Sequence, residues 1–412
     1  MERSKVGFKM NLPKQSAVIL LILISLFTKI VVVLATPNIF HSFVDLWGYN
    51  VYLNSVVFPF LQDWSIPYIN YNWEYPILMM APTALATIAM LVVRDISAFW
   101  WAYATLMSIC DAVIIYCVYF IALEIRGGNK NAAFMAGLLV ATAFSAAYHV
   151  LICYDAFAVM LMMLGLYWTI CKGNHTKSYA GILCGYLAKL FPIVIFPFVF
   201  FYNMKRSNWS TQWKEIARPA LPLLMFLVIP FVLINPESVW VYFDRTEIDK
   251  GVFGATLNYA LTAFLQYIGI TIDSVVMTTA LYVVLAIVLV VLVWAACRNK
   301  TMKPIELLKY SLLALTALIV FVPHHSPQYM IWIVPILAIL AANDWWKILW
   351  FYILQAFLYI RFPLTYYSNW TNAGYKPDNF GITLAFFMIL FVVLAYLIWI
   401  TTKSNSLWSN YD

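Results

Sequence analysis

A carboxylate flanked by tyrosines stands near the start of the chain. If residues 42–56 form a helix, Asp45, Tyr49 and Tyr52 share one face, because they are four and three residues apart. Aromatic rings pack against the apolar faces of sugars, and a carboxylate can accept the proton of a hydroxyl group. This face therefore suits an uncharged, polyhydroxylated ligand, with Asp45 as its general base. The same pattern also fits an amphipathic helix whose aromatic residues lie among lipid headgroups.

Two further groups of polar residues could bind the same kind of ligand. Glu74 and Tyr75 immediately precede residues 76–93, where the Glu74 carboxylate could hold a sugar hydroxyl or anchor the chain at the interface. A later turn between two apolar segments contains side chains that can donate hydrogen bonds to an anionic leaving group, namely those of His324, His325, Gln328 and Tyr329. Adjacent histidines in a turn do not easily share one metal ion, and no cysteine or carboxylate stands at ligand spacing nearby, so we expect no metal site.

Three charged residues lie within or at the edge of apolar segments. Lys189 stands three residues before Pro192, and an ionisable group at membrane depth costs on the order of 3 kcal/mol. It could meet a phosphate there or extend to the interface. Asp155 opens a helix, where the helix dipole favours an acid. Asp111 lies deep within residues 98–123 and needs a partner, for which Lys189 is a candidate.

A loop at residues 236–272 supplies further cations. Arg245 and Lys250 stand close together in it and could clamp a phosphate group. They could equally be solvated loop charges, and the sequence leaves both interpretations open.

The composition of the whole chain indicates which elements must position these residues. Hydrophobic residues make up 64% of the chain and charged residues 10%, and the mean hydropathy is +0.83, which excludes a soluble domain. The net charge of +7 lies in short loops, where it indicates orientation rather than nucleic-acid binding. We predict an all-α polytopic membrane protein with about 10–12 transmembrane helices. The apolar segments lie at about 17–36, 76–93, 98–123, 131–149, 155–171, 178–203, 219–235, 274–297, 305–322, 328–342, 345–362 and 381–401.

Two of these segments decide how the chain crosses the membrane. If residues 76–93 dip in and return, and residues 178–203 form a hairpin broken at 189–192, more Lys and Arg residues share the side of the N-terminus than if both segments cross. Basic residues are enriched in cytoplasmic loops, so we prefer this arrangement and place the N-terminus in the cytoplasm. Residues 37–76 then form the first external loop.

The remaining features are consistent with one membrane domain. The six cysteines lie within or beside apolar segments without the spacing of metal ligands, so we predict buried thiols. The first apolar run is too long for a signal peptide and is predicted to be a retained span. Residues 1–412 contain no repeat of 20–50 residues and no flexible linker, which predicts a single domain.

Four short motifs give the chain a resemblance to a known family. In order, they are D-L-W-x-Y from Asp45, W-E-Y-P from Trp73, A-K-L-F-P-I from Ala188 and H-S-P-Q-Y-x-x-W-x-x-P from His325. They resemble the hallmarks of GT-C glycosyltransferases, above all the polyprenyl-phosphate-mannose-dependent mannosyltransferases of bacteria and archaea. A more distant likeness is to the catalytic subunit of the first GPI mannosyltransferase. The family's usual Y-P-P is replaced here by Tyr-Pro-Ile from Tyr75. This departure changes the sequence at the junction between the first loop and residues 76–93.

The resemblance implies a GT-C-like bundle that transfers a hexose, above all mannose, with inversion and without a metal. The donor would be a polyprenyl (dolichyl) phosphate sugar and the acceptor a glycan or glycolipid hydroxyl, at the extracytoplasmic face of the cell membrane. Asp45 would be the catalytic base, with no cofactor beyond the lipid-linked donor. The resemblance and the residue patterns described above together predict a set of substrate-binding residues: Tyr49, Tyr52, Glu74, Tyr75, Asp155, Lys189, Arg245, His324, His325, Gln328 and Tyr329. Membrane lipids are further expected partners, and nucleic acid is not.

A secondary transporter is the alternative from a different class. Such proteins typically have charged residues within apolar segments and a broken helix. This chain has Asp111, Asp155 and Lys189 in such positions. The long acidic and aromatic first loop, and a sequence without a visible two-fold repeat, favour the transferase.

Overall fold

The computed structural model describes residues 12–36, 53–54, 56–71, 73, 75–237, 256–322, 327–360 and 380–403. Within these ranges the chain is helical and contains no strand, which confirms the predicted all-α class. Six helices are long and apolar enough to cross a membrane, and one bent helix pair adds a seventh span if it is counted as one. Shorter apolar helices complete this polytopic bundle.

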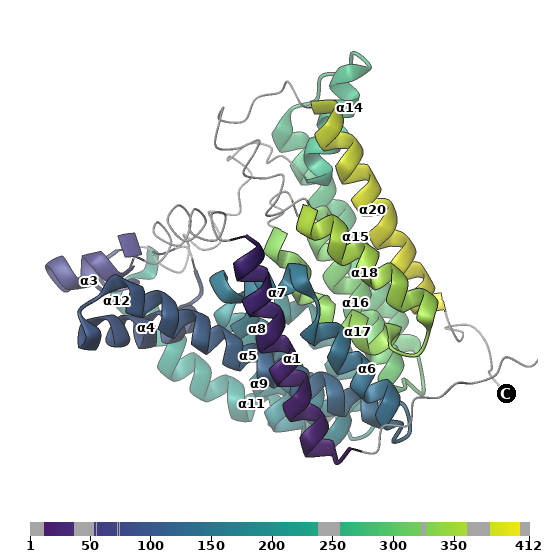
Figure 1. Ribbon diagram of the computed structural model, residues 1–412, viewed down its shortest axis with the longest axis horizontal. Helices are drawn as coiled ribbons and strands as arrows, with labels where there is room; N and C mark the ends of the chain where they lie inside the picture. Colours follow the sequence, from purple (N-terminus) through teal and green to yellow (C-terminus); the bar gives the residue numbers. More distant parts are fainter. Residues whose placement is uncertain are drawn as a thin grey trace, which may run out of the picture.

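The long helices come from all parts of the chain (Figure 1). They are α1 (Lys14–Ala35), α5 (Ile96–Ile125), α8 (Asp155–Lys172), α15 (Ser274–Arg298), α16 (Pro304–Phe321) and a continuous span built from α11 (Trp209–Leu223), the π-helical turn η4 (Leu224–Val228) and α12 (Ile229–Ile234). The bent pair consists of α6 (Lys130–Ala141) and α7 (Phe144–Ile152), which meet at 57°.

The other described elements are mostly shorter. The helices are α3 (Phe58–Asp63), α4 (Met80–Val93), α9 (His175–Ala188), α10 (Phe196–Met204), α14 (Leu257–Tyr267), α17 (Val334–Ala341), α18 (Trp345–Tyr359) and α20 (Phe380–Lys403). Three short 3-10 helices are also described: η2 (Ile77–Met79), η3 (Phe191–Ile195) and η5 (Pro327–Trp332).

Helices α1 and α5 run in opposite directions and define two ends of the bundle. Val32, near the end of α1, packs with Tyr148 and Cys153, and Trp100, near the start of α5, packs against the same cluster. We name this the Asp155 end, because α8 begins there at Asp155, two residues after Cys153. The end of α1 and the start of α5 therefore lie at the same end of the bundle; the path of residues 76–93 relative to a membrane stays a prediction.

The opposite end is named after Arg126, which directly follows α5. Tyr202 of α10 interacts electrostatically with Glu124 in the last turn of α5. The loop after α10 is joined to the loop between α15 and α16, since Arg206 donates a hydrogen bond to the Met302 carbonyl at 3.1 Å. Several loops rich in Lys and Arg therefore gather at the Arg126 end.

Helices α9 and α10 form a hairpin whose tip lies at Lys189. Tyr179, in the second turn of α9, donates a hydrogen bond to Gln212 in the first turn of α11 at 2.6 Å. Because α11 starts soon after α10 ends, the start of α9 lies beside the end of α10. The chain turns back at Lys189, whose backbone is extended (φ −161°, ψ 142°). Pro192 explains the break, because its ring cannot continue α9 without meeting the carbonyl four residues earlier.

Two glycines let α8 and α9 pack backbone against backbone. A Cβ atom added to Gly181 of α9 would lie 2.8 Å from the Gly165 nitrogen and 2.8 Å from the Leu161 carbonyl oxygen of α8. Small residues at such a contact are typical of tightly packed membrane helices. The close contact fixes the tip of the hairpin against the first turn of α8.

All six cysteines are free, as predicted, but one of them is not buried. Cys110, Cys117 and Cys153 are buried, and Cys171 and Cys184 are half-buried. Cys297 is exposed, because it lies in the last turn of α15, a helix with much of its surface directed away from the bundle. The expectation of a buried thiol was wrong at this position.

Candidate functional site

A buried ion pair joins the start of α8 to the tip of the α9–α10 hairpin. The Lys189 ammonium lies 2.7 Å from Oδ1 of Asp155, and the two side chains are 11% and 0% exposed. Asp155 is the first residue of α8, where the helix dipole favours a carboxylate. Lys189 follows the last residue of α9, and the turn at Pro192 directs it to this position. Two residues predicted to bind substrate are therefore in direct contact.

Three aromatic rings, one at the start of α8 and two from η5, surround the Lys189 ammonium. Its nitrogen lies 4.3 Å from the ring centroid of Tyr154, 4.9 Å from that of Tyr329 and 5.4 Å from that of Trp332. Each of these distances is within the range of a cation–π contact, which is stronger where water is excluded. Tyr329 and Trp332 both belong to η5, and their rings stack at 4.2 Å. The rings hold the ammonium without neutralising it.

Asp155 has one engaged oxygen and one free oxygen. Its Oδ1 accepts hydrogen bonds from Lys189 at 2.7 Å and from the Trp332 indole at 2.6 Å. Its Oδ2 is buried and accepts no hydrogen bond from any described residue. A buried carboxylate oxygen without a donor is costly. It can accept a hydrogen bond from a ligand that enters the site.

The aromatic surface continues from the ion pair towards the first loop. The rings of Tyr75 and Tyr154 meet edge to face at 5.0 Å, and Trp73 adjoins Tyr75 at 5.4 Å. Tyr68 lies beyond Trp73 at 6.0 Å. Burial raises the pKa of the neighbouring Tyr71 to about 12. This wall of rings suits the apolar faces of a sugar.

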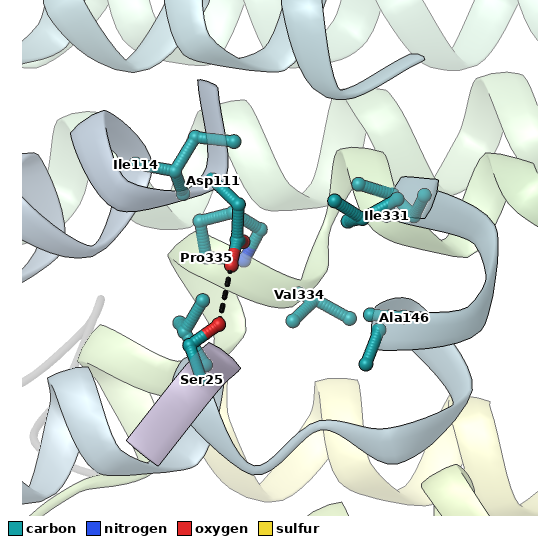
Figure 2. A pocket seen from close by; sticks show the side chains of 10 residues that line it. Ser25, Asp111, Ile114, Ala146, Ile331, Val334 and Pro335 are labelled. Carbon is teal, nitrogen blue, oxygen red and sulfur yellow. Dashed lines mark hydrogen bonds between the residues drawn. The ribbon is translucent and has the colours of Figure 1, made fainter. Parts of the chain in front are cut away.

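A second buried ion pair crosses the bundle between α1 and α5. Asp111 Oδ2 accepts hydrogen bonds from Lys29 at 2.5 Å and from Ser25 at 2.6 Å. The sequence offered Lys189 as the partner of Asp111, and this expectation was wrong, because Lys189 pairs with Asp155. Figure 2 shows Ser25 and Asp111 at the edge of a small cavity. Its remaining walls are apolar and consist of Ile114, Val140, Ala146, Ala147, Val150, Ile331, Val334 and Pro335.

The structure brings together most of the predicted substrate-binding residues that it describes. One connected group contains Tyr75, Asp155, Lys189 and Tyr329, with Tyr75 joined to Lys189 through the ring of Tyr154. Gln328 is buried in η5 beside Tyr329. The other predicted residues lie outside the described part of the chain: Asp45, Tyr49, Tyr52, Glu74, Arg245, His324 and His325. Among the described residues, no group of three or more His, Cys, Asp or Glu could hold a metal ion.

Sequence reasoning missed two members of the site, Tyr154 and Trp332. Tyr154 directly precedes Asp155, and its ring contacts both Lys189 and Tyr75. Trp332 is the tryptophan of the motif H-S-P-Q-Y-x-x-W-x-x-P, so its fixed place in that motif was the available signal. Its role as a hydrogen-bond donor to Asp155 needed coordinates.

No protein-family model and no curated protein matches the chain. Among solved structures, the crystal structure of ArnT from Cupriavidus metallidurans bound to undecaprenyl phosphate is similar to this chain, with a TM-score of 0.44 and 15% sequence identity. The match covers 79% of this chain and 62% of that chain, which is less than two thirds of its length.

Proposed function

We propose that this protein is a membrane glycosyltransferase of the GT-C type. It transfers a hexose, mannose first among the candidates, from a polyprenyl phosphate to a hydroxyl group of a glycan or glycolipid. The observation that carries this proposal is the buried Lys189–Asp155 pair surrounded by rings of Tyr75, Tyr154 and η5. A cation, a carboxylate and several aromatic faces are the groups that a sugar linked to a phosphate requires.

Each part of this site matches one part of the donor. The Lys189 ammonium can bind a phosphate oxygen while Asp155 and the rings keep it in place. The rings of Tyr75 and Tyr154 can pack against the sugar, and the free Asp155 Oδ2 can accept a sugar hydroxyl proton in a hydrogen bond. The surrounding apolar helices can hold the polyprenyl tail, which explains why the enzyme is membrane-embedded.

The chemical step needs a base and a stabilised leaving group. The acceptor oxygen attacks C1 of the sugar and gives its proton to the Asp45 carboxylate. The bond from C1 to the phosphate oxygen breaks with its electron pair remaining on that oxygen, so polyprenyl phosphate leaves and the anomeric configuration inverts. Lys189, with His324, His325 and Arg245 as further cations or donors, would stabilise that phosphate.

The proposed orientation places the site on the extracytoplasmic face. Basic residues gather at the Arg126 end, including Lys130, Lys205, Arg206, Arg298, Lys300 and Lys303, and such an excess is typical of the cytoplasmic side. Single cysteines placed at Gly128 and Asn174 should therefore resist an impermeant thiol reagent applied from outside. Labelling of either position in intact cells would reverse the orientation.

The decisive test is an assay of the purified full chain with a panel of polyprenyl-phosphate sugars. We expect transfer from one of them, loss of transfer in Asp45→Asn, and loss in Lys189→Met. Lys177→Met is the matched control, because Lys177 is an exposed lysine of α9, the helix that Lys189 directly follows. Wild-type turnover in Asp45→Asn would remove the base assignment. Absence of transfer from every donor would refute the proposed activity.

The two buried ion pairs are the specific observation behind the transporter alternative. A transporter would move solute across a sealed vesicle without forming a glycosidic bond. Purified chain in proteoliposomes, supplied with labelled lipid-linked sugar and acceptor, separates the two functions, since only a transferase yields a labelled glycan.

A further inference from the structure

Two buried hydrogen-bond donors lie next to each other in the wall of rings. Trp73 and Tyr68 are only 3% and 5% exposed, and their rings meet edge to face at 6.0 Å. Trp73 Nε1 and Tyr68 Oη are both buried, and neither makes a hydrogen bond with a described residue. A buried polar group without a partner lowers stability. Two such groups in neighbouring rings therefore need an explanation.

Packing on both sides holds these two rings in place. The Tyr68 ring meets Phe231 of α12 edge to face at 5.9 Å, and the Trp73 ring meets that of Tyr75 at 5.4 Å. Tyr68 and Trp73 also belong to the main hydrophobic core of the bundle. The two donors are thus carried by a well-packed support, as the few polar groups of a ligand site usually are.

The backbone of Tyr68 is strained. Its φ of 65° lies in the left-handed region, which a residue with a bulky side chain rarely adopts. A short turn imposes this conformation, because the Tyr68 N–H donates to the Tyr71 carbonyl at 2.9 Å and the Asn70 side chain accepts the Ile66 N–H at 2.8 Å. Ile69 and Asn70 in this turn are exposed. Such strain is typical of ligand sites, and a small shift of the turn would bring both donors to a ligand.

We propose that Trp73 and Tyr68 form a subsite for the acceptor, in which both donors bind hydroxyl oxygens of a sugar. The ring of Tyr154, 4.3 Å from the Lys189 ammonium, and the adjoining ring of Tyr75 are the ones that face the donor sugar in the proposed function. Trp73 adjoins Tyr75 on the other side, and Tyr68 lies beyond Trp73. The pair is therefore left for the second sugar. The assignment to the acceptor rests on the proposed function, whereas the two unpaired donors do not.

The first test compares stability with ligand binding. Purified full chain in lipid nanodiscs is titrated with octyl α-D-mannoside below its micelle-forming concentration, and thermal unfolding is followed. Octyl tetraethylene glycol ether carries the same tail without a sugar. We expect the mannoside, and not the ether, to raise the melting temperature. Tyr68→Phe removes an unpaired hydroxyl, so it should not lower the melting temperature of the protein without ligand. It should nevertheless weaken mannoside binding about three- to tenfold. Trp73→Phe keeps a ring but removes the indole donor, and it should weaken binding in the same way.

Tyr119→Phe is the matched control. Tyr119 is fully buried in α5, and its hydroxyl likewise makes no hydrogen bond with a described residue. The same group is therefore removed near the Arg126 end, and mannoside binding should stay at the wild-type level. A wild type whose melting temperature does not respond to the mannoside would overturn the proposal. Equal binding in Tyr68→Phe and Tyr119→Phe would overturn it as well.

Kinetics separate this inference from the proposed function. In the transfer assay, Tyr68→Phe should raise the KM for the mannoside acceptor and leave the KM for polyprenyl-phosphate mannose unchanged. A rise in the KM of the donor alone would overturn the assignment to the acceptor. Absence of transfer by the wild type would refute the proposed activity, and the binding test would still decide whether Tyr68 and Trp73 hold a sugar.

Discussion

Trp332 donates its indole N–H to Asp155 Oδ1 at 2.6 Å, although 177 residues separate the two in the chain. The Trp332 ring also stacks on Phe191 at 4.1 Å, next to the tip of the α9–α10 hairpin. One side chain therefore holds the carboxylate and the hairpin at the same time. The orientation of Asp155 depends on η5 as much as on its own helix.

Replacing the indole separates its hydrogen bond from its stacking. Trp332→Phe keeps a ring against Phe191 and Tyr329 but removes the donor to Asp155. Hydrogen bonds to charged groups contribute about 1.5–3 kcal/mol, so we expect sugar transfer to fall about tenfold or more while the protein stays folded. Steady-state kinetics of purified protein measure this. Trp332→Ala should fall further, and an unchanged rate in Trp332→Phe would show that the indole N–H is unnecessary.

The Lys189–Asp155 pair should respond differently to single and double substitution. Lys189→Met leaves a buried carboxylate unpaired, and breaking such a pair costs about 3–5 kcal/mol. We expect a lower melting temperature and no transfer. Lys189→Met/Asp155→Leu removes both charges and should recover much of the stability but none of the activity. Recovery of activity in the double variant would mean that neither charge takes part in the reaction.

The Lys29–Asp111 pair is expected to be structural. Asp111→Asn or Lys29→Met alone should lower the unfolding temperature, because each leaves one buried charge unpaired. The double variant Lys29→Met/Asp111→Leu should restore stability and transfer sugar at close to the wild-type rate. Loss of transfer in this stable double variant would give the pair a role in the reaction.

The contact between α8 and α9 can be tested with two matched glycine substitutions. Gly181→Ala would place its Cβ against the backbone of Gly165 and Leu161, which cannot move without separating the helices. Gly137→Ala would meet only the flexible end of the Leu21 side chain, at 2.5 Å. We expect a loss of about 1–3 kcal/mol for Gly181→Ala and a smaller loss for Gly137→Ala. Thermal unfolding ranks them, and equal losses would contradict the close backbone contact.

The sequence predicted those features that depend on local chemistry. Pro192 after Lys189 indicated a broken helix, and the structure has its hairpin tip there. Lys189 and Tyr329 were each predicted to bind substrate, and the structure places the Lys189 ammonium 4.9 Å from the Tyr329 ring centroid. Helical class followed from the long apolar segments, whose backbone polar groups can be satisfied only within helices in lipid.

Pairings across the bundle could not be predicted in the same way. Lys29 is a single cation in an apolar first span, and nothing in its neighbourhood points to Asp111, which is 82 residues away. The spacing of two residues on one helix is known from its period, but the relative position of two helices depends on packing contacts such as that of Gly181 with Gly165. The role of Trp332 was hidden for the same reason.

Mutual neutralisation of Lys189 and Asp155 has a consequence for how substrates arrive. An ion pair with no net charge produces only a weak field at long range, so it does little to draw dissolved anions out of the surrounding water. A soluble sugar phosphate would have to find this ion pair by unassisted collision. A carrier with an isoprenoid chain is already confined to two dimensions, and its lateral diffusion supplies the encounter that electrostatic steering does not.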